Sequence, residues 1–384
     1  MNSQFFTAKL QLASAASLKA EGTRVTQLLP LVPASLLQSE IPLSGLALDT
    51  VLQSRQDVSA VLGKIDDRLL VIVGPCSIHD PAAALDYARR LKKLSDRLSG
   101  DLCVVMRAYL EKPRTSVGWK GLINDPYLDE SFAINDGLKI SRKLFVDINA
   151  MGLPVATELL DTLSPQYFAD AITFGAIGAR TTESQLHREL VSGVSFPVGF
   201  KNGTDGGLTV AMDAMKSSAA PHRFLGATKT GLTGIVQTSG NSDTAVILRG
   251  GSKGPNFDAN SVDQAIGSLR FRGQRDVVIV DCSHGNSNKD YRNQPKVADV
   301  VAQQVARGQR NIVGLMLESN IYEGRQDVPA SGPGGLLPGV SITDGCIGWD
   351  ATVKTLERLA EAVQLRRTVV PAATLTPEDS DDGC

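Results

Sequence analysis

The chain has 384 residues, of which 42% are hydrophobic and 21% are charged, and its formal net charge is −2. This composition is typical of a protein with a folded core and excludes an intrinsically disordered chain. A charge balance so close to zero provides no basic surface for nucleic acid or for an anionic membrane. We therefore expect small-molecule partners, with no nucleic acid and no membrane.

The apolar runs and the cysteines bear on the compartment of the protein. No apolar run reaches the roughly 18 residues of a membrane span, and the best one, Leu69–Val73, has the length of a strand. Residues 1–24 are poor in acidic groups, as transit peptides are, but their only cations are Lys9, Lys19 and Arg24, and they lack the long apolar core of a secretory signal. The five cysteines are scattered and form no CxxC pair. These features predict a protein of the reducing cytoplasm.

Residues 1–65 precede the regular part of the chain. They contain a polar start, a segment interrupted by Pro30, Pro33 and Pro42, and a predicted helix from Leu46 to Leu62. We expect an N-terminal extension that makes subunit contacts, and a homodimer or homotetramer.

Eight short apolar or β-branched runs follow, and a helix-like stretch succeeds each of them. Two of these stretches, Asp80–Leu98 and Asp350–Leu365, show the helical period clearly. Eight alternations of strand and helix predict an α/β fold, a (β/α)8 TIM barrel over residues 66–366. The runs are Leu69–Val73, Leu102–Met106, Pro154–Thr157, Thr173–Ala179, Pro197–Phe200, Ala245–Leu248, Val277–Val280 and Ile312–Leu317.

Three segments depart from this alternation. Phe224–Ala227 and Gly234–Thr238 flank a turn rich in Gly and Thr, which predicts an inserted β-hairpin. Gly332–Gly339 is a Gly- and Pro-rich loop, for which we expect mobility and the role of a lid. Residues 371–384 are rich in Pro and acidic groups, and we expect a disordered tail.

A reactive or charged residue stands at the exit of every predicted strand. A polar residue after each strand is expected from solvent exposure alone. These exits, however, include one of the five cysteines and one of the four histidines of the chain, which solvent exposure does not explain. In a barrel the strand exits share the C-terminal rim, where active sites are built. We therefore expect these side chains to meet at one site: Cys76, Arg107, Glu158, Arg180, Lys201, Arg249, His284 and Glu318.

Four of the residues at this rim have the chemistry of metal ligands. Cys76, His284 and Glu318, with Asp344 in the loop after the last strand, offer a thiolate, an imidazole and two carboxylates. This mixture suits one divalent cation among Mn, Fe, Co and Zn, and it suits Mg or Ca poorly. Cys282 and Cys346 stay open as alternative ligands, although Cys76, after a Gly-Pro strand exit, is the favoured thiol. The alternative is that Cys76 and His284 are ordinary buried residues.

The remaining charges at the strand exits are mostly cationic. Cations gathered at the strand ends of a neutral protein indicate an anionic ligand, and the guanidinium group suits phosphate and carboxylate. Six cations balance about the charge of two phosphate groups and one carboxylate, which predicts phosphorylated substrates. The six are Arg107, Lys112, Arg114, Arg180, Lys201 and Arg249.

Six motifs of the chain resemble those of the class I 3-deoxy-D-arabino-heptulosonate 7-phosphate (DAHP) synthases, over about residues 30 to 365. The resemblance implies a (β/α)8 barrel with an N-terminal extension. It also implies condensation of phosphoenolpyruvate with erythrose 4-phosphate at the entry to the shikimate pathway. The motifs are Gly74–Asp80 (GPCSIHD), Lys112–Thr115 (KPRT), Gly178–Ser184 (GARTTES), Gly199–Gly206 (GFKNGTDG), Leu248–Gly251 (LRGG) and Asp281–Asn286 (DCSHGN).

Residue roles follow from these motif matches. The resemblance assigns the metal to Cys76, His284, Glu318 and Asp344, and the phosphate of erythrose 4-phosphate to Arg114 and Thr115. Ser116 stands where many members have a second Thr, and Gly332–Gly339 is longer than the family leads us to expect. The implied contacts of phosphoenolpyruvate are Arg107, Lys112, Glu158, Arg180, Lys201, Arg249 and His284.

We assign proton transfer to Lys112 and His284, and to Glu158 the orientation of a water or of a lysine. Three other functions remain open, and one of them is a related synthase that condenses phosphoenolpyruvate with another aldose. A Schiff-base aldolase with the same fold would use Lys201 or Lys112 as an amine nucleophile and would need no metal. A phospho-ligand sensor would keep the pocket without catalysis.

The resemblance also predicts regulation by an aromatic amino acid. The inhibitor pocket of the family lies between the extension and the inserted hairpin, and the chain looks most like the tyrosine-sensitive members. Gly226 leaves room for a ring that carries a para-hydroxyl, although a glycine here also suits a simple turn. We expect tyrosine to be the inhibitor, and the matching positions are Pro165, Gln166, Ser195, Phe224 and Gly226.

Overall fold

The computed structural model describes residues 22–113, 118–329 and 332–369. Arg114, Thr115 and the predicted tail of residues 371–384 therefore lie outside the described residues. The sheet is a closed barrel of parallel strands in the order β1-β10-β9-β8-β5-β4-β3-β2. Its strands are β1 (Leu69–Gly74), β2 (Leu102–Arg107), β3 (Val155–Glu158), β4 (Phe174–Ile177), β5 (Val198–Lys201), β8 (Thr244–Leu248), β9 (Val278–Asp281) and β10 (Ile312–Glu318).

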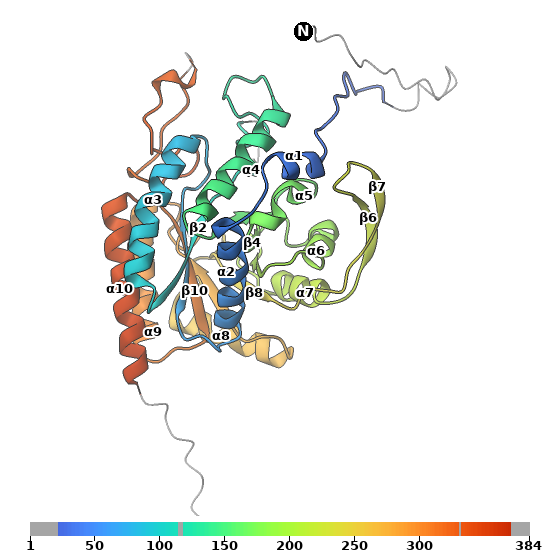
Figure 1. The fold of residues 1–384 in the computed structure, drawn as a ribbon. Coiled ribbons are helices and arrows are strands. Elements are labelled where there is room, and N and C mark those ends of the chain that lie inside the picture. Colours follow the sequence, from blue (N-terminus) through green and yellow to red (C-terminus); the bar gives the residue numbers. More distant parts are fainter. Residues whose placement is uncertain (1–21, 114–117, 330–331, 370–384) are drawn as a thin grey trace, which may run out of the picture.

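Helices connect successive strands and surround the sheet (Figure 1). The predicted (β/α)8 barrel is thus confirmed, and the strand bounds agree with the predicted runs to within about two residues. The helices of the barrel are α3 (Pro81–Leu98), α4 (Ile134–Ala150), α5 (Pro165–Phe168), α6 (Gln185–Val191), α7 (Thr209–Ser218), α8 (Ala259–Phe271), α9 (Gln294–Ala306) and α10 (Trp349–Thr368), with the short 3-10 helices η2 (Ala169–Ala171), η3 (Tyr291–Asn293) and η4 (Pro333–Gly335).

Local sequence explains the start of the best-defined helix. Asp80 precedes α3, and its side chain accepts hydrogen bonds from the backbone N–H groups of Ala82 and Ala83. Pro81 occupies the first helical position, where a missing N–H costs nothing. The helix buries one apolar stripe, which includes Leu91 and Leu94.

Two helices of the N-terminal extension pack on the barrel: α1 (Ala34–Glu40) and α2 (Leu46–Leu62). The end of α2 closes the N-terminal mouth of the barrel, because Val58, Val61 and Leu62 join the cluster of side chains that fills the interior. That interior is apolar, with residues such as Ile72 and Phe174, both fully buried. The barrel interior is therefore a filled core that α2 closes at the N-terminal end. The C-terminal end stays open, and the predicted site residues lie there.

The predicted hairpin is present as β6 (Arg223–Ala227) paired antiparallel with β7 (Thr233–Gln237). It lies outside the barrel, at the right of Figure 1, and its tip reaches the extension. Lys229 at this tip donates to Gln38 of α1, and Gln38 in turn donates to the carbonyl oxygen of Gln166 in α5. Among the described residues, no helix is both long and apolar enough to cross a membrane.

Candidate active site

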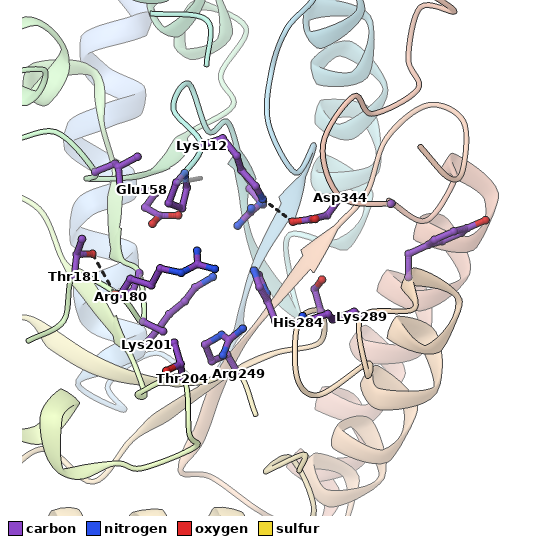
Figure 2. A pocket seen from close by; sticks show the side chains of 18 of the residues that line it. Lys112, Glu158, Arg180, Thr181, Lys201, Thr204, Arg249, His284, Lys289 and Asp344 are labelled. Atoms are coloured by element: carbon purple, nitrogen blue, oxygen red, sulfur yellow. Dashed lines mark hydrogen bonds and ion pairs between the residues drawn. The ribbon is translucent and has the colours of Figure 1, made fainter. Parts of the chain in front are cut away.

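A pocket of about 570 Å³ opens at the C-terminal ends of the barrel strands (Figure 2). The structure brings most of the predicted site residues together there. The predicted residues that line it are Arg107, Lys112, Glu158, Arg180, Lys201, Arg249, His284 and Asp344. Cys76 and Glu318 are buried at its edge, where the Cys76 Sγ lies 2.9 Å from the Lys112 Nζ and a Glu318 oxygen lies 2.9 Å from the Arg107 guanidinium.

Three of the four predicted metal ligands form one cluster. Single ligand atoms of Cys76, Glu318 and Asp344 all lie within 4.8 Å of one another. His284 stands next to this cluster, with its Nε2 3.9 Å from the Glu318 Oε1. The cluster therefore combines one thiol, two carboxylates and a neighbouring imidazole; Cys76, His284 and Glu318 come from strand exits, and Asp344 comes from the loop after the last strand.

Lys112 lies between two members of this cluster. Its Nζ donates to the Cys76 Sγ at 2.9 Å and to the Asp344 Oδ2 at 2.7 Å. Burial alone would lower the pKa of this ammonium group, but Cys76 and the negative charges of Glu318 and Asp344 raise it above its usual value. Lys112 is therefore held in its charged form.

The Glu318 carboxylate is fixed from two sides. Arg107 donates to its Oε1 and Ser283 donates to its Oε2, each at 2.9 Å. Burial would raise the pKa of this carboxyl, but the positive charge of Arg107, followed by those of His284 and Lys112, lowers it. Glu318 is therefore an ionised carboxylate in the barrel interior, with an orientation set before any ligand arrives.

The thiol of Cys76 is in a different electrostatic position. Burial, followed by the charge of Glu318, raises the pKa of this thiol above its usual value. A buried thiol beside two carboxylates needs a cation in order to ionise, and a thiolate with carboxylate and imidazole donors suits a borderline divalent metal. The thiol, carboxylate and imidazole groups of this site therefore fit the divalent cation that the sequence predicted.

The sequence analysis missed Asp281, which links the metal side of the pocket to its cationic side. This residue ends β9 and is fully buried. Its Oδ2 lies 2.9 Å from the His284 Nδ1 and 3.0 Å from the Lys201 Nζ. With Nδ1 occupied in this way, the Nε2 of His284 is the nitrogen that faces Glu318. The sequence offered one signal for Asp281: it is an acidic residue at the end of an otherwise apolar strand.

The loop after β9 holds His284 in an unusual backbone conformation. His284 has φ 56°, and Asn288 and Lys289 further along the same loop also have positive φ. The N–H of Lys289 donates to the carbonyl oxygen of His284 at 2.8 Å, which closes the turn. Non-glycine residues in this region are strained and cluster at functional sites.

Three cations point into the pocket from β4, β5 and β8: Arg180, Lys201 and Arg249 (Figure 2). Asn202 fixes the position of Arg249, since its Oδ1 accepts the Arg249 backbone N–H at 2.8 Å. The Thr182 hydroxyl donates to the carbonyl oxygens of Lys201 and of Gly178. Thr182 and Asn202, which lie close in the sequence to Arg180 and Lys201, thus hold the backbones of Lys201 and Arg249 in place.

Two of the glycine-rich motifs pack against each other beside these cations. A Cβ atom at Gly251 would overlap the backbone of Asp205 and Gly206. The loop after β8 and the loop after β5 can approach this closely because neither carries a side chain at the contact. This contact explains the glycines of two motifs that are almost 50 residues apart.

Arg107 differs from the other cations in its partners. It is 1% exposed, and it donates to the carbonyl oxygen of Cys76 as well as to Glu318. Its guanidinium also stacks on the Tyr109 ring, 3.5 Å from the ring centroid. The pocket has further lining residues that the sequence analysis did not single out, among them Thr204, Lys289, Tyr291 and Arg325.

The remaining predicted residues lie elsewhere. Cys282 is fully buried in the apolar core, and Cys346 is buried with its Sγ 3.8 Å from the Asp344 carbonyl oxygen. The predicted inhibitor positions occupy α5 (Pro165, Gln166), the segment between α6 and β5 (Ser195) and β6 (Phe224, Gly226). Gly226 is paired with Gly234 within the hairpin, so it is a strand residue and not a turn glycine.

The family model of the DAHP synthetase I family matches residues 49–357. The tyrosine-inhibited phospho-2-dehydro-3-deoxyheptonate aldolase of Candida albicans is 57% identical over 353 residues, which are 91% of this chain and 95% of that protein. The phenylalanine-inhibited protein of Saccharomyces cerevisiae is 55% identical over 91% of this chain and 95% of that protein. The chain belongs to the DAHP synthetase I family.

A solved member of the family has the same fold. The phospho-2-dehydro-3-deoxyheptonate aldolase of Francisella tularensis superposes with a TM-score of 0.87 and 50% identity, covering 89% of this chain and 99% of that one. The activity expected from the sequence follows from this membership. The chain is a DAHP synthase, a transferase that condenses phosphoenolpyruvate with erythrose 4-phosphate at the first step of the shikimate pathway.

Proposed function

We propose that the pocket at the barrel rim is the site of this condensation and that its cationic side binds phosphoenolpyruvate. The supporting observation is the convergence of Arg180, Lys201 and Arg249 opposite a buried thiol and carboxylate cluster. Guanidinium and ammonium groups match the phosphate and carboxylate of this substrate. Arg107 lines the same pocket and also anchors Glu318, so one residue serves both halves of the site.

Cys76, His284, Glu318 and Asp344 would hold one divalent cation, among Mn, Fe, Co and Zn. When bound, such a cation supplies Lewis acidity toward the aldehyde of erythrose 4-phosphate. The protein residues position the substrates, so that C3 of phosphoenolpyruvate attacks the aldehyde carbon. Water then adds at C2, and loss of phosphate leaves the 2-keto acid.

Lys112 is the better placed of the two residues expected to transfer protons. Its ammonium stands at the junction of the cluster and the pocket, next to Asp344. The Nε2 of His284 cannot hold a cation and transfer a proton at the same time, so we assign His284 to the cluster. Glu158 lines the opposite wall, where it would orient the attacking water.

Arg114 and Thr115 would bind the phosphate of erythrose 4-phosphate. Their motif begins at Lys112, whose backbone N–H donates to the carbonyl oxygen of Lys120 at 2.9 Å. Lys112 itself lines the pocket, so the motif begins at the edge of the pocket. The second substrate would therefore enter beside the cluster.

The charges of both candidate lysines argue against a Schiff-base aldolase. An amine nucleophile needs a lowered pKa, whereas the acidic neighbours of Lys112 raise its pKa. Lys201 is paired with the buried Asp281 at 3.0 Å. Borohydride added with both substrates should leave no adduct, and a trapped lysine adduct would contradict the proposal.

One assay tests the proposed reaction against the Schiff-base aldolase and the sensor. Phosphate release from phosphoenolpyruvate should require erythrose 4-phosphate, should stop when the metal is chelated, and should return when Mn²⁺ is added. A sensor would release no phosphate. Release that survives chelation and full removal of metal would contradict the metal site.

Tyrosine is the proposed inhibitor. The Candida albicans and Schizosaccharomyces pombe relatives, at 57% and 55% identity, are named tyrosine-inhibited, whereas the Saccharomyces cerevisiae relative, at 55%, is named phenylalanine-inhibited. The inhibitor would bind beside Pro165, Gln166, Ser195, Phe224 and Gly226. Inhibition assays with tyrosine, phenylalanine and tryptophan test this, and insensitivity to millimolar tyrosine would contradict it.

The extension of residues 1–65 would make the contacts of a homodimer or homotetramer. Several of its apolar side chains are exposed, including Leu28 at 80% and Leu29 at 71%. Apolar groups in this number favour burial against another surface. Sedimentation of the purified protein tests the oligomer, and localisation of the tagged full chain tests the proposed cytoplasmic compartment.

A further inference from the structure

Asp344 is the most exposed member of the cluster, and its position needs an explanation. Its side chain is 62% exposed, whereas Glu318 is 1% exposed. Asp344 lies in a loop, without a strand to fix it. The question is which part of the protein holds this carboxylate within reach of Cys76 and Glu318.

Hydrogen bonds hold the loop on both sides of Asp344. On one side the Thr343 hydroxyl lies 2.6 Å from that of Ser77. On the other side Cys346 pairs with Gly324, with backbone hydrogen bonds of 2.9 and 3.1 Å in the two directions. Asp344 and Gly345 form the short span between these two anchors.

The ring of Tyr291 lies against this span. A Cβ atom at Gly345 would meet the Tyr291 Cδ1 at 2.5 Å and the Cγ and Cε1 at 3.3 Å, and these are its three nearest neighbours. A Cβ at Gly324 would lie 3.7 Å from the Tyr291 hydroxyl oxygen. The Tyr291 ring therefore lies across both paired segments, the one with Gly324 and the one with Gly345 and Cys346. The ring atoms occupy the space that a side chain at Gly345 would need.

The base of Tyr291 is itself fixed to the metal side of the site. Tyr291 begins η3, which leads directly into α9. Gln294, the first residue of α9, exchanges two hydrogen bonds with the backbone of Glu318, at 2.8 and 3.0 Å. The ring thus connects a rigid element next to one carboxylate of the cluster with the loop that carries the other.

We propose that Tyr291 is a positioning residue for Asp344, acting through the contact of its ring with Gly345. The inference rests on the proposed metal site and adds a residue that the motif matches do not include. Gly345 is needed because the ring occupies the space of its Cβ. Its φ lies outside the left-handed region, so alanine there would strain the structure only through this contact.

The test measures the affinity of the metal-free full chain for Mn²⁺ by competition with a fluorescent chelator, without any substrate. Gly345→Ala should weaken Mn²⁺ binding by about 10- to 100-fold, the usual effect of disturbing the support of a ligand. Tyr291→Phe keeps the ring and should bind Mn²⁺ as the wild type does. Gly267→Ala is the matched control, because a Cβ there meets nothing within 4 Å.

A double variant separates positioning from a general loss of structure. In Tyr291→Ala with Gly345→Ala the clash is absent, so the second substitution should cost less than threefold relative to Tyr291→Ala alone. Unchanged Mn²⁺ affinity in Gly345→Ala, or an equal loss with and without the ring, would overturn the proposal. Unchanged affinity in Cys76→Ala would instead overturn the metal site, and this inference with it.

Discussion

The two ends of the barrel use charge in opposite ways. At the C-terminal end, two ion pairs are fully buried: Arg107 with Glu318, both 1% exposed, and Lys201 with Asp281, at 4% and 0%. At the N-terminal end the interior is closed by the apolar end of α2. The ion pairs of that end are partly exposed, as in Arg367 with Asp67, at 35% and 48%.

This difference separates function from stability. A buried ion pair loses its hydration on folding, so it adds little net stability although breaking it is costly. The protein keeps such pairs where they orient Glu318, His284 and Lys201 toward a ligand. Apolar burial at the other end stabilises the barrel without any such cost. Substitutions at the rim should therefore change chemistry, and those at the closed end should change stability.

The largest effect is expected at the thiol of the rim. Cys76→Ala should abolish metal binding and lower turnover by about a thousandfold or more, because several kcal/mol of Lewis-acid stabilisation is lost and each 1.36 kcal/mol is tenfold. Cys346→Ala should retain both metal and turnover. Bound metal is measured in the purified variants together with kcat, and normal metal content in Cys76→Ala would contradict the assignment.

The closed end predicts the reverse pattern. Leu62 is fully buried in the interior cluster, so Leu62→Ala should lower the free energy of unfolding by about 2–5 kcal/mol through lost burial and a residual cavity. The kcat and KM of the folded variant should stay at the wild-type values. Leu52→Ala is the matched control, since Leu52 lies in the same helix and is 50% exposed. A changed KM in Leu62→Ala would weaken the distinction between the two ends.

A buried carboxyl near the rim should make stability depend on pH. Burial, followed by the charge of Asp161, raises the pKa of Glu111 to about 7 from its ordinary value of 4.5. Between these two pH values the unfolded chain has released a proton that the folded chain keeps. Stability should therefore fall as pH rises from about 4.5 to 7, by ~3 kcal/mol from this group, since one pKa unit corresponds to about 1.36 kcal/mol.

Glu111→Gln removes this titration while keeping the shape of the side chain. The decline in the free energy of unfolding between pH 4.5 and 7 should be smaller in the variant than in the wild type, because the other titrating groups contribute equally to both. Urea unfolding at a series of pH values gives the difference. Parallel curves for the two proteins would show that Glu111 ionises normally in the fold.

The two substrates should be separable by their cations. Arg180→Ala should mainly weaken the use of phosphoenolpyruvate, and Arg114→Ala mainly that of erythrose 4-phosphate, each by about a hundredfold in kcat/KM, the scale of charged hydrogen bonds. Steady-state kinetics with each substrate varied in turn measures both constants. Equal losses for both substrates in both variants would mean that the two phosphate sites are wrongly assigned.

The sequence predicted the rim better than the contacts within it. Parallel strands end at one rim, so Arg180, Lys201 and Arg249 were predictable from strand exits alone. The role of Asp281 was not, because only the closed barrel shows that it faces both Lys201 and His284. The contact between Tyr291 and Gly345 was not predictable either. It depends on a ring that fills the space of a missing Cβ, and such a contact leaves no periodic pattern in a single sequence.

The smallest effect is expected from the ion pair between Arg367 and Asp67 at the closed end, although its geometry is bidentate. Arg367 donates to both carboxylate oxygens of Asp67 at 2.8 Å, and to the carbonyl oxygen of Gly100 at 3.0 Å. Solvent screens a pair this exposed, so Arg367→Ala should lower the free energy of unfolding by less than about 1 kcal/mol. The difference from the wild type should shrink further in high salt. Urea unfolding at low and high salt measures both. A loss of unfolding free energy above about 2 kcal/mol would mean that the stability of the closed end also depends on its ion pairs. The distinction between a catalytic end and an end stabilised by apolar burial would then be wrong.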